Sequence, residues 1–169
     1  MGTKTEFIAG IGIMIILLIG AGGLHSSDPI AVAYATPDGG EFSIDSPVPP
    51  YSYSDGGVLV VDISPDNPFY SEGGTGLSIN STYVFDDVFI VENNQSETGY
   101  EVICVRISSD FIGIGFFTGP FNGSWYDVVE VSLRADEGTG IGMRVNTTGL
   151  ELGDYWGEIT IEAWGGDCR

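Results

Sequence analysis

The chain has 169 residues and a formal net charge of −19 at pH 7, because 24 acidic side chains oppose only five lysines and arginines. A surface of this sign repels nucleic acid and anionic lipid, so we expect neither as a partner. Hydrophobic residues make up 43% of the chain, which excludes disorder driven by acidity. The simplest explanation of the acidity is a protein that stays hydrated in concentrated salt, and a cation-binding surface is the alternative.

An apolar stretch near the amino terminus has the features of an export segment. Residues 7–24 read FIAGIGIMIILLIGAGGL and follow Lys4; the stretch is short for a membrane span and long for the apolar part of a signal peptide. Small residues at Ala21–Gly23 and Ala33–Ala35 offer two cleavage sites. We therefore expect a cleaved signal peptide or a retained anchor helix within residues 1–35, with the rest of the chain at the cell surface or secreted.

This segment is the one part of the chain that we expect to contact a membrane, and only if it is not cleaved. A further alternative is a pilin-like subunit, in which the apolar segment is retained and packs as a helix in a filament core. The residues directly before the apolar run lack the cleavage pattern usual for such a leader.

Residues 36–56 have the composition of an extension or linker. Three prolines lie between residues 47 and 50, and a Tyr- and Ser-rich stretch follows. One short strand is expected at Glu41–Ile44, after a turn-forming Asp-Gly-Gly sequence. The folded domain is expected over residues 57–169.

Apolar, β-branched and aromatic runs of strand length fill the rest of the chain, and turn-forming residues separate them. Asp86 and Asp87 interrupt one run, which predicts a β-bulge or a corner between sheets. Asn93–Gly99 is expected to be a polar turn. The pattern predicts an antiparallel, jelly-roll-like β-sandwich of about seven to nine strands. The runs are residues 58–63, 82–91, 100–108, 111–117, 125–133, 141–145 and 155–163.

The residue inventory argues against an enzyme. His25 is the only histidine and lies just after the apolar stretch, so a serine or cysteine nucleophile in the domain has no histidine base. The one lysine, Lys4, precedes the same stretch, and neither an H-E-x-x-H nor a G-x-x-x-x-G-K sequence is present. Carboxylate pairs are too abundant in this chain to indicate a glycosidase. We therefore expect neither catalysis nor an organic cofactor.

Calcium is the one cofactor that the sequence leaves open. Asp62 and Asp66 lie close together in the chain, as do Asp86 and Asp87, and carboxylates in loops are suitable Ca²⁺ ligands. No EF-hand sequence is present. The alternative, which we favour, is that these residues end strands and form Asx turns.

Four sequons for N-linked glycosylation are present, at Asn80, Asn94, Asn122 and Asn146. All fall in expected turns or at strand ends, where a glycan can point outward. We expect at least one to be used, although Asn, Ser and Thr also accumulate in turns by chance.

Two cysteines, Cys104 and Cys168, can form one disulfide bond in an oxidising compartment. The bond would pin the carboxy terminus to a strand. A buried thiol at Cys104 and an intermolecular bond at Cys168 are the alternatives.

Three stretches together resemble an archaeal family of exported domains of unknown function, which in turn is similar to camelysin-like and biofilm-fibre subunits of bacteria. The resemblance covers about residues 57–163, through the order and spacing of its motifs. The stretches are Gly76–Phe89, Val91–Asn94 and Leu152–Ala163.

The resemblance implies a jelly-roll-like sandwich, an extracellular location and a structural role, and together with the charge it implies a salt-loving archaeal source. Some relatives of the wider group polymerise by donor-strand complementation. Camelysins have been described as metalloproteases, but the domain of this chain contains no histidine that could bind such a metal.

We therefore expect a structural protein, a subunit of a cell-surface filament or matrix that assembles with itself or with other surface proteins. The alternative is a monomeric, membrane-tethered or secreted glycoprotein that acts as a binding or adhesion module. Self-association of the mature chain distinguishes the two.

Two segments are candidates for a strand donated to a neighbouring copy. In the first, Ile30, Val32 and Tyr34 alternate with alanines, which gives one bulky and one thin face. The second candidate carries Phe42 and Ile44, and it is the remaining one if cleavage follows Ala35. Pairing of either segment with its own domain is the alternative.

Overall fold

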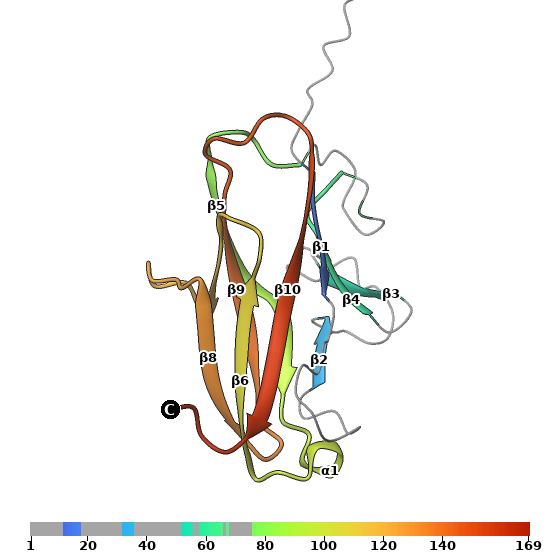
Figure 1. The fold of residues 1–169 in the computed structure, drawn as a ribbon, viewed down its shortest axis with the longest axis vertical. Coiled ribbons are helices and arrows are strands. Elements are labelled where there is room, and N and C mark those ends of the chain that lie inside the picture. Colours follow the sequence, from blue (N-terminus) through green and yellow to red (C-terminus); the bar gives the residue numbers. More distant parts are fainter. Residues whose placement is uncertain (1–11, 18–31, 36–51, 56–57, 66, 68–75) are drawn as a thin grey trace, which may run out of the picture.

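Two β-sheets pack face to face in the computed structural model, and one helical turn lies at one end of the molecule (Figure 1). The structure describes residues 12–17, 32–35, 52–55, 58–65, 67 and 76–169. Within this part of the chain, no helix is long and apolar enough to cross a membrane. The prediction of a mostly β protein built from two sheets is confirmed.

The larger sheet has six strands in the order β3-β4-β1-β10-β6-β8. The pairs in it are antiparallel, except that β1 runs parallel to β10. The strands are β1 (Gly12–Leu17), β3 (Ser52–Asp55), β4 (Val58–Asp62), β6 (Val102–Ser109), β8 (Val128–Arg134) and β10 (Asp154–Gly165).

The smaller sheet has four antiparallel strands in the order β2-β5-β9-β7. These are β2 (Val32–Ala35), β5 (Thr82–Glu92), β7 (Ile114–Thr118) and β9 (Gly138–Asn146). The pairing of β5 with β9 shifts register between Phe85 and Phe89, and Asp87 takes a left-handed conformation with φ 49°. The bulge predicted from Asp86 and Asp87 is confirmed.

The core lies between the two sheets. Strand alternation turns every second side chain of β6 inward, so Ile103, Val105 and Ile107 are fully buried. From the smaller sheet, Phe89 and Met143 are fully buried against them in the same cluster. This apolar contact is the main stabilising feature of the fold.

One helical turn, α1 (Gln95–Thr98), lies where the sequence predicted only a polar turn. The Asn94 side chain accepts a hydrogen bond from the N–H of Ser96 and caps the helix start. Gly99 ends it with a left-handed φ of 72°. Both capping signals were present in the sequence, but the segment is too short to show a helical period.

The expected amino-terminal helix needs a correction, because residues 12–17 form strand β1. That this stretch is a signal peptide or an anchor stays a prediction. Isoleucine favours strands, and β1 has a strand neighbour on each side. Strands β1, β2 and β3 all precede residue 57, where the sandwich was expected to begin. They bring the described strands to ten, above the expected seven to nine. The strand expected at Glu41–Ile44 lies outside the described residues.

Candidate functional site

Strand β1 occupies an interior position of the larger sheet, between β10 and β4 (Figure 1). Its register runs from Gly12 opposite Asp154 to Leu17 opposite Ile159 on one side. On the other side, Ile15 pairs with Val61 of β4. Ile159 and Val61 are both fully buried, so buried apolar residues lie beside β1 on both sides, whereas Asp154 and Glu158 also border it on the β10 side.

This strand connects two parts of the sheet. In the described structure, β1 alone pairs with both β4 and β10, so the β3–β4 hairpin joins β10 through it. The hairpin also contacts the other sheet, where the Ser52 hydroxyl donates to the carbonyl of Val88 at 2.6 Å. β1 covers six of the twelve residues of β10; for Thr160–Gly165, the described pairing is with β6 alone.

The first predicted donor segment lies partly in β2. Val32 pairs with Glu92 and Tyr34 with Ile90, both in β5 of the same chain. Ile30 and the second candidate pair, Phe42 and Ile44, lie outside the described residues. In this single chain, the described part of the first segment therefore pairs with its own domain.

The predicted calcium ligands are distributed over both sheets. Asp62 ends β4, is buried, and accepts a hydrogen bond from the N–H of Ser64 at 2.8 Å. Asp86 lies in β5 and accepts from the N–H of Phe121 at 3.1 Å, while Asp87 forms the bulge. Asp66 lies outside the described residues. Among the described residues, these aspartates form no group of three potential ligands, and the hydrogen bonds fit strand ends and turns.

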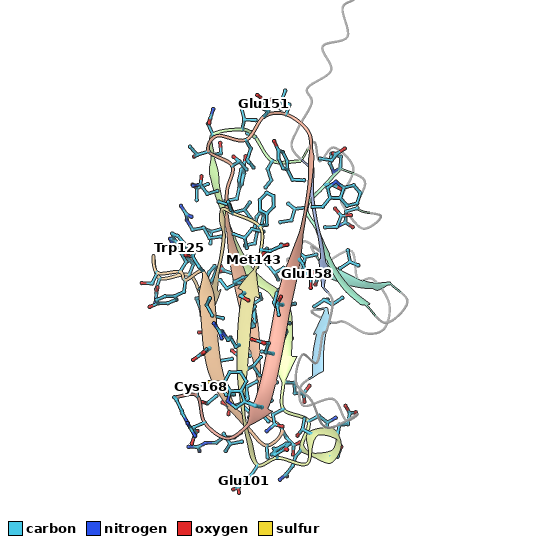
Figure 2. The ribbon with its side chains drawn as sticks, in the orientation of Figure 1. Glu101, Trp125, Met143, Glu151, Glu158 and Cys168 are labelled. Atoms are coloured by element: carbon cyan, nitrogen blue, oxygen red, sulfur yellow. A yellow bond between two sulfur atoms is a disulfide. The ribbon has the colours of Figure 1, made fainter. Side chains whose placement is uncertain are left out.

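Cys104 and Cys168 form the predicted disulfide bond, which closes a sequence separation of 64 residues. Cys104 lies on the outer side of β6 and is buried because the carboxy-terminal tail covers it. The N–H of Cys168 donates to the Ser132 hydroxyl of β8 at 2.9 Å, so the tail crosses β6. Figure 2 shows Cys168 beside this end of the sheet.

A carboxylate of Glu130 lies beside this disulfide, and the three potential ligand atoms are within 4.8 Å of one another. Among the described residues, these three form the group whose side chains are close enough together to be considered as metal ligands. Both sulfur atoms are bonded to each other, so neither offers the thiolate that a metal needs.

The four sequons lie in loops or at strand ends, as predicted, and differ in exposure. Asn80 and Asn122 are exposed, whereas Asn94 and Asn146 are half-buried. In three of them the asparagine oxygen accepts the N–H two residues ahead, at Ser96, Ser124 and Thr148. Asn80 instead accepts from the N–H of Gly149, across two loops.

Sequence reasoning missed an aromatic loop between β7 and β8. The guanidinium of Arg144 lies 4.2 Å from the ring centre of Trp125, a cation–π contact. Trp125 lies so close over Gly115 that a Cβ there would collide with the indole ring. Tyr126 pairs with Phe116 and covers part of the β7 edge. Gly115 was the available signal, because a glycine in a strand leaves a flat surface on which a ring can lie.

The chain matches no curated protein and no solved structure. It does match the family described as "Protein of unknown function (DUF1102)" over residues 31–168, which is most of its length and nearly all of the two sheets. The chain therefore belongs to the DUF1102 family of proteins of unknown function.

Proposed function

We propose that this chain is an exported structural protein, a subunit of a cell-surface filament or matrix that assembles by exchange of a strand between copies. The observation that carries the proposal is the position of β1, which comes from the apolar stretch expected to be a signal peptide. The resemblance to archaeal exported domains and to camelysin-like and biofilm-fibre subunits, with a jelly-roll-like sandwich, supports the same role.

Cleavage of the apolar stretch after Gly23 would remove β1 and open the sheet between β10 and β4. Two strand edges would then face each other across a slot with the buried residues Ile159 and Val61 on its two sides. Unpaired backbone groups in such a place are costly, at roughly 1–3 kcal/mol for each buried group. A strand from a neighbouring copy restores the pairing, in the manner of β-strand addition.

The donor proposed for this slot is the segment that carries Ile30, Val32 and Tyr34. It follows the earlier cleavage site, so it survives as the amino terminus of the mature chain. To enter a neighbour, residues 32–35 would leave β5 of their own domain. If cleavage occurs after Ala35 instead, the segment that carries Phe42 and Ile44 is the donor.

The test begins by determining the mature amino terminus of the exported protein. A chain that starts there, concentrated in molar salt, is expected to form fibres visible by electron microscopy. A synthetic peptide that spans residues 12–17 should fill the slot and block assembly, whereas the same peptide with Ile15→Pro should not, because proline removes a ladder hydrogen bond. A folded mature chain that stays monomeric at high concentration, or fibres insensitive to the peptide, would contradict the proposal.

A monomeric glycoprotein that acts as an adhesion module is the second candidate. The observation that favours it is that β1 fills its position from within the same chain, which leaves no open slot there. The exposed ring of Tyr126 and the half-covered ring of Trp125 would then provide a contact surface. Retention of residues 12–17 in the protein isolated from cells is expected on this proposal. No catalytic activity is part of either candidate, since His25 is the only histidine.

A further inference from the structure

The surroundings of the disulfide contain more ligand chemistry than a covalent crosslink needs. The sulfur atoms of Cys104 and Cys168 and one carboxylate oxygen of Glu130 lie within 4.8 Å of one another. Ligand atoms of one tetrahedral zinc ion are about 3.3–3.8 Å apart, given bonds of about 2.0–2.3 Å. Small rotations of these side chains therefore bring the three atoms to that spacing. In the oxidised chain the two sulfur atoms are bonded to each other, so the ligand set exists only after reduction.

The strand register places two of the three ligands side by side on the sheet. Cys104 of β6 lies opposite Ser132 of β8, and Glu130 is two residues from Ser132, so Cys104 and Glu130 are diagonal neighbours on one face. Arg106 lies opposite Glu130, and its guanidinium is 3.9 Å from one oxygen of that carboxylate. A carboxylate has two oxygens, so Arg106 need not leave when a metal binds. Its charge offsets part of the negative charge that two thiolates and a carboxylate place around a divalent ion.

The carboxy-terminal tail is held over β6 by hydrogen bonds that do not involve sulfur. The N–H of Gly166 donates to the carbonyl of Val102 at 2.8 Å, and the N–H of Cys168 donates to the Ser132 hydroxyl at 2.9 Å. Both bonds remain available when the disulfide is broken, so we expect Cys168 to stay near Cys104. Ligands that are already close lose less conformational entropy when they bind a metal.

A hollow beside the disulfide gives reagents and metal ions a route to the sulfur atoms. It has a volume of about 540 Å³ and is lined by Glu130, Trp164 and the tail residues 165–169, which include Cys168. Cys168 is half-buried, whereas Cys104 is fully buried under the tail, so Cys168 is the sulfur that a reductant reaches first. Asp167 also lines the hollow, so the fourth position of a tetrahedral ion is open to water or to this carboxylate.

We propose that, after reduction of the disulfide, Cys104, Cys168 and Glu130 bind one Zn²⁺ ion, which then fastens the tail in place of the sulfur–sulfur bond. Two molecules of a small thiol supply the two electrons and leave as their own disulfide, and the two cysteines become thiols. Zn²⁺ then displaces one proton from each thiol. Thiolate ligands favour Zn²⁺ over Ca²⁺ and Mg²⁺, which prefer oxygen. This inference does not depend on the proposed structural role.

The test uses the full chain, reduced with a water-soluble phosphine that is then removed by gel filtration without air. The phosphine takes an oxygen atom from water and becomes its oxide, so it leaves no competing thiol. Co²⁺ is the first probe, because thiolate-bound Co²⁺ absorbs strongly in the near ultraviolet. The reduced chain is expected to bind one Co²⁺ with this absorption, and the oxidised chain to show none. Zn²⁺ should displace Co²⁺ and raise the melting temperature of the reduced chain but not of the oxidised chain.

Variants separate the three ligands from the general acidity of the chain. Glu130→Gln should weaken Zn²⁺ binding about tenfold or more, since even the outer partners of metal ligands contribute that much. Glu162→Gln is the matched control, because Glu162 lies on the other side of Arg106, and it should leave binding unchanged. The double variant Cys104→Ser, Cys168→Ser should show no thiolate absorption. The proposal is overturned if the two glutamine variants bind Zn²⁺ equally well, if one Co²⁺ links two chains, or if the reduced chain is unfolded both with and without Zn²⁺.

Discussion

The two halves of the six-stranded sheet are built in different ways. In one half, β10, β6 and β8 pair antiparallel, and a disulfide fastens the tail across them. In the other half, the β3–β4 hairpin reaches β10 only through β1, in the parallel pairing of a strand that begins at Gly12. The first half is held by antiparallel pairing of its strands and by a covalent bond, whereas the second depends on one strand from the apolar amino-terminal stretch.

The two halves of the sheet therefore depend on β1 to different extents. We expect the pairing of β6 with β8 and with Ile159–Gly165 of β10 to persist while β1 changes, because β1 is not part of those pairs. The other end of β10 does pair with β1. The β3–β4 half cannot keep its place in the sheet without some strand next to it. We call β10, β6 and β8 the fixed half and the β3–β4 hairpin the conditional half. A sheet built in this way is suited to receiving a strand from another molecule.

The largest effect is expected from removing residues 1–23 from the chain. In dilute protein, a peptide that covers Val58–Asp62 of β4 should lose protection from hydrogen exchange, because the amides in it that point toward β1 have lost their partners. The amides of Ile103 and Val105 in β6 should stay protected. Mass spectrometry of exchanged peptides measures both. Equal loss of protection in β4 and β6 would show that the two halves are one cooperative unit.

Loss of the disulfide is expected to have the next largest effect, on the fixed half. The double variant Cys104→Ser, Cys168→Ser should lose about 4 kcal/mol of stability to unfolding, from the entropy of a loop of this length. Ser132→Ala is the control, since it removes only the hydrogen bond from the N–H of Cys168 and should cost about 1 kcal/mol. Denaturant titration gives both values. A disulfide variant no less stable than Ser132→Ala would mean that the tail adds little to this half.

A smaller effect is expected at Asn93, which ties the fixed half to the other sheet. Its amide nitrogen donates to the carbonyls of Tyr100 and Leu133, and its oxygen accepts from the Thr98 hydroxyl. Because the side chain is fully buried, Asn93→Ala should cost about 1–3 kcal/mol. Asn94→Ala removes the helix cap and an exposed hydrogen bond from the Ser96 hydroxyl, and should cost about 1 kcal/mol or less. The reverse order of stabilities would mean that α1, not Asn93, secures this corner.

The fixed half was largely predictable from sequence, and the conditional half was not. Alternation of apolar residues placed β6, β8 and β10 to within a few residues, and two cysteines sufficed for the disulfide. The apolar run that contains β1 has no alternation, so a helix and a buried strand cannot be distinguished there. β3 reads Ser-Tyr-Ser-Asp and lacks the apolar pattern of a strand. It forms because β4 lies next to it.

The candidate site was less predictable still. The slot arises where Leu17 lies beside Ile159, and no local pattern links residues so far apart in the chain. The outer surface of the same sheet has a similar origin, because Arg106, Arg134 and Trp164 lie on three strands. Sequence periodicity shows that each points outward from its own strand, but only the strand order shows that they share one surface.

The smallest predicted effect concerns the Glu130 carboxylate, which lies within 4.8 Å of both disulfide sulfur atoms. Reduction requires attack by a thiolate, and a negative charge at this range opposes an anionic reagent by about 1 kcal/mol in water. Glu130→Gln should therefore speed reduction by an anionic thiol such as glutathione about fourfold at low salt, a change that follows from that energy. The rate of reduction by the cationic thiol cysteamine should rise less, because the substitution also removes the attraction between the Glu130 carboxylate and the ammonium group of this reagent. Molar salt should diminish the difference between the two reagents.

Glu162→Gln is the control, because Glu162 lies on the opposite side of Arg106 from Glu130. If both variants change the ratio of the two rates equally, the effect comes from the net charge of the protein, and the position of Glu130 beside the disulfide does not slow its reduction.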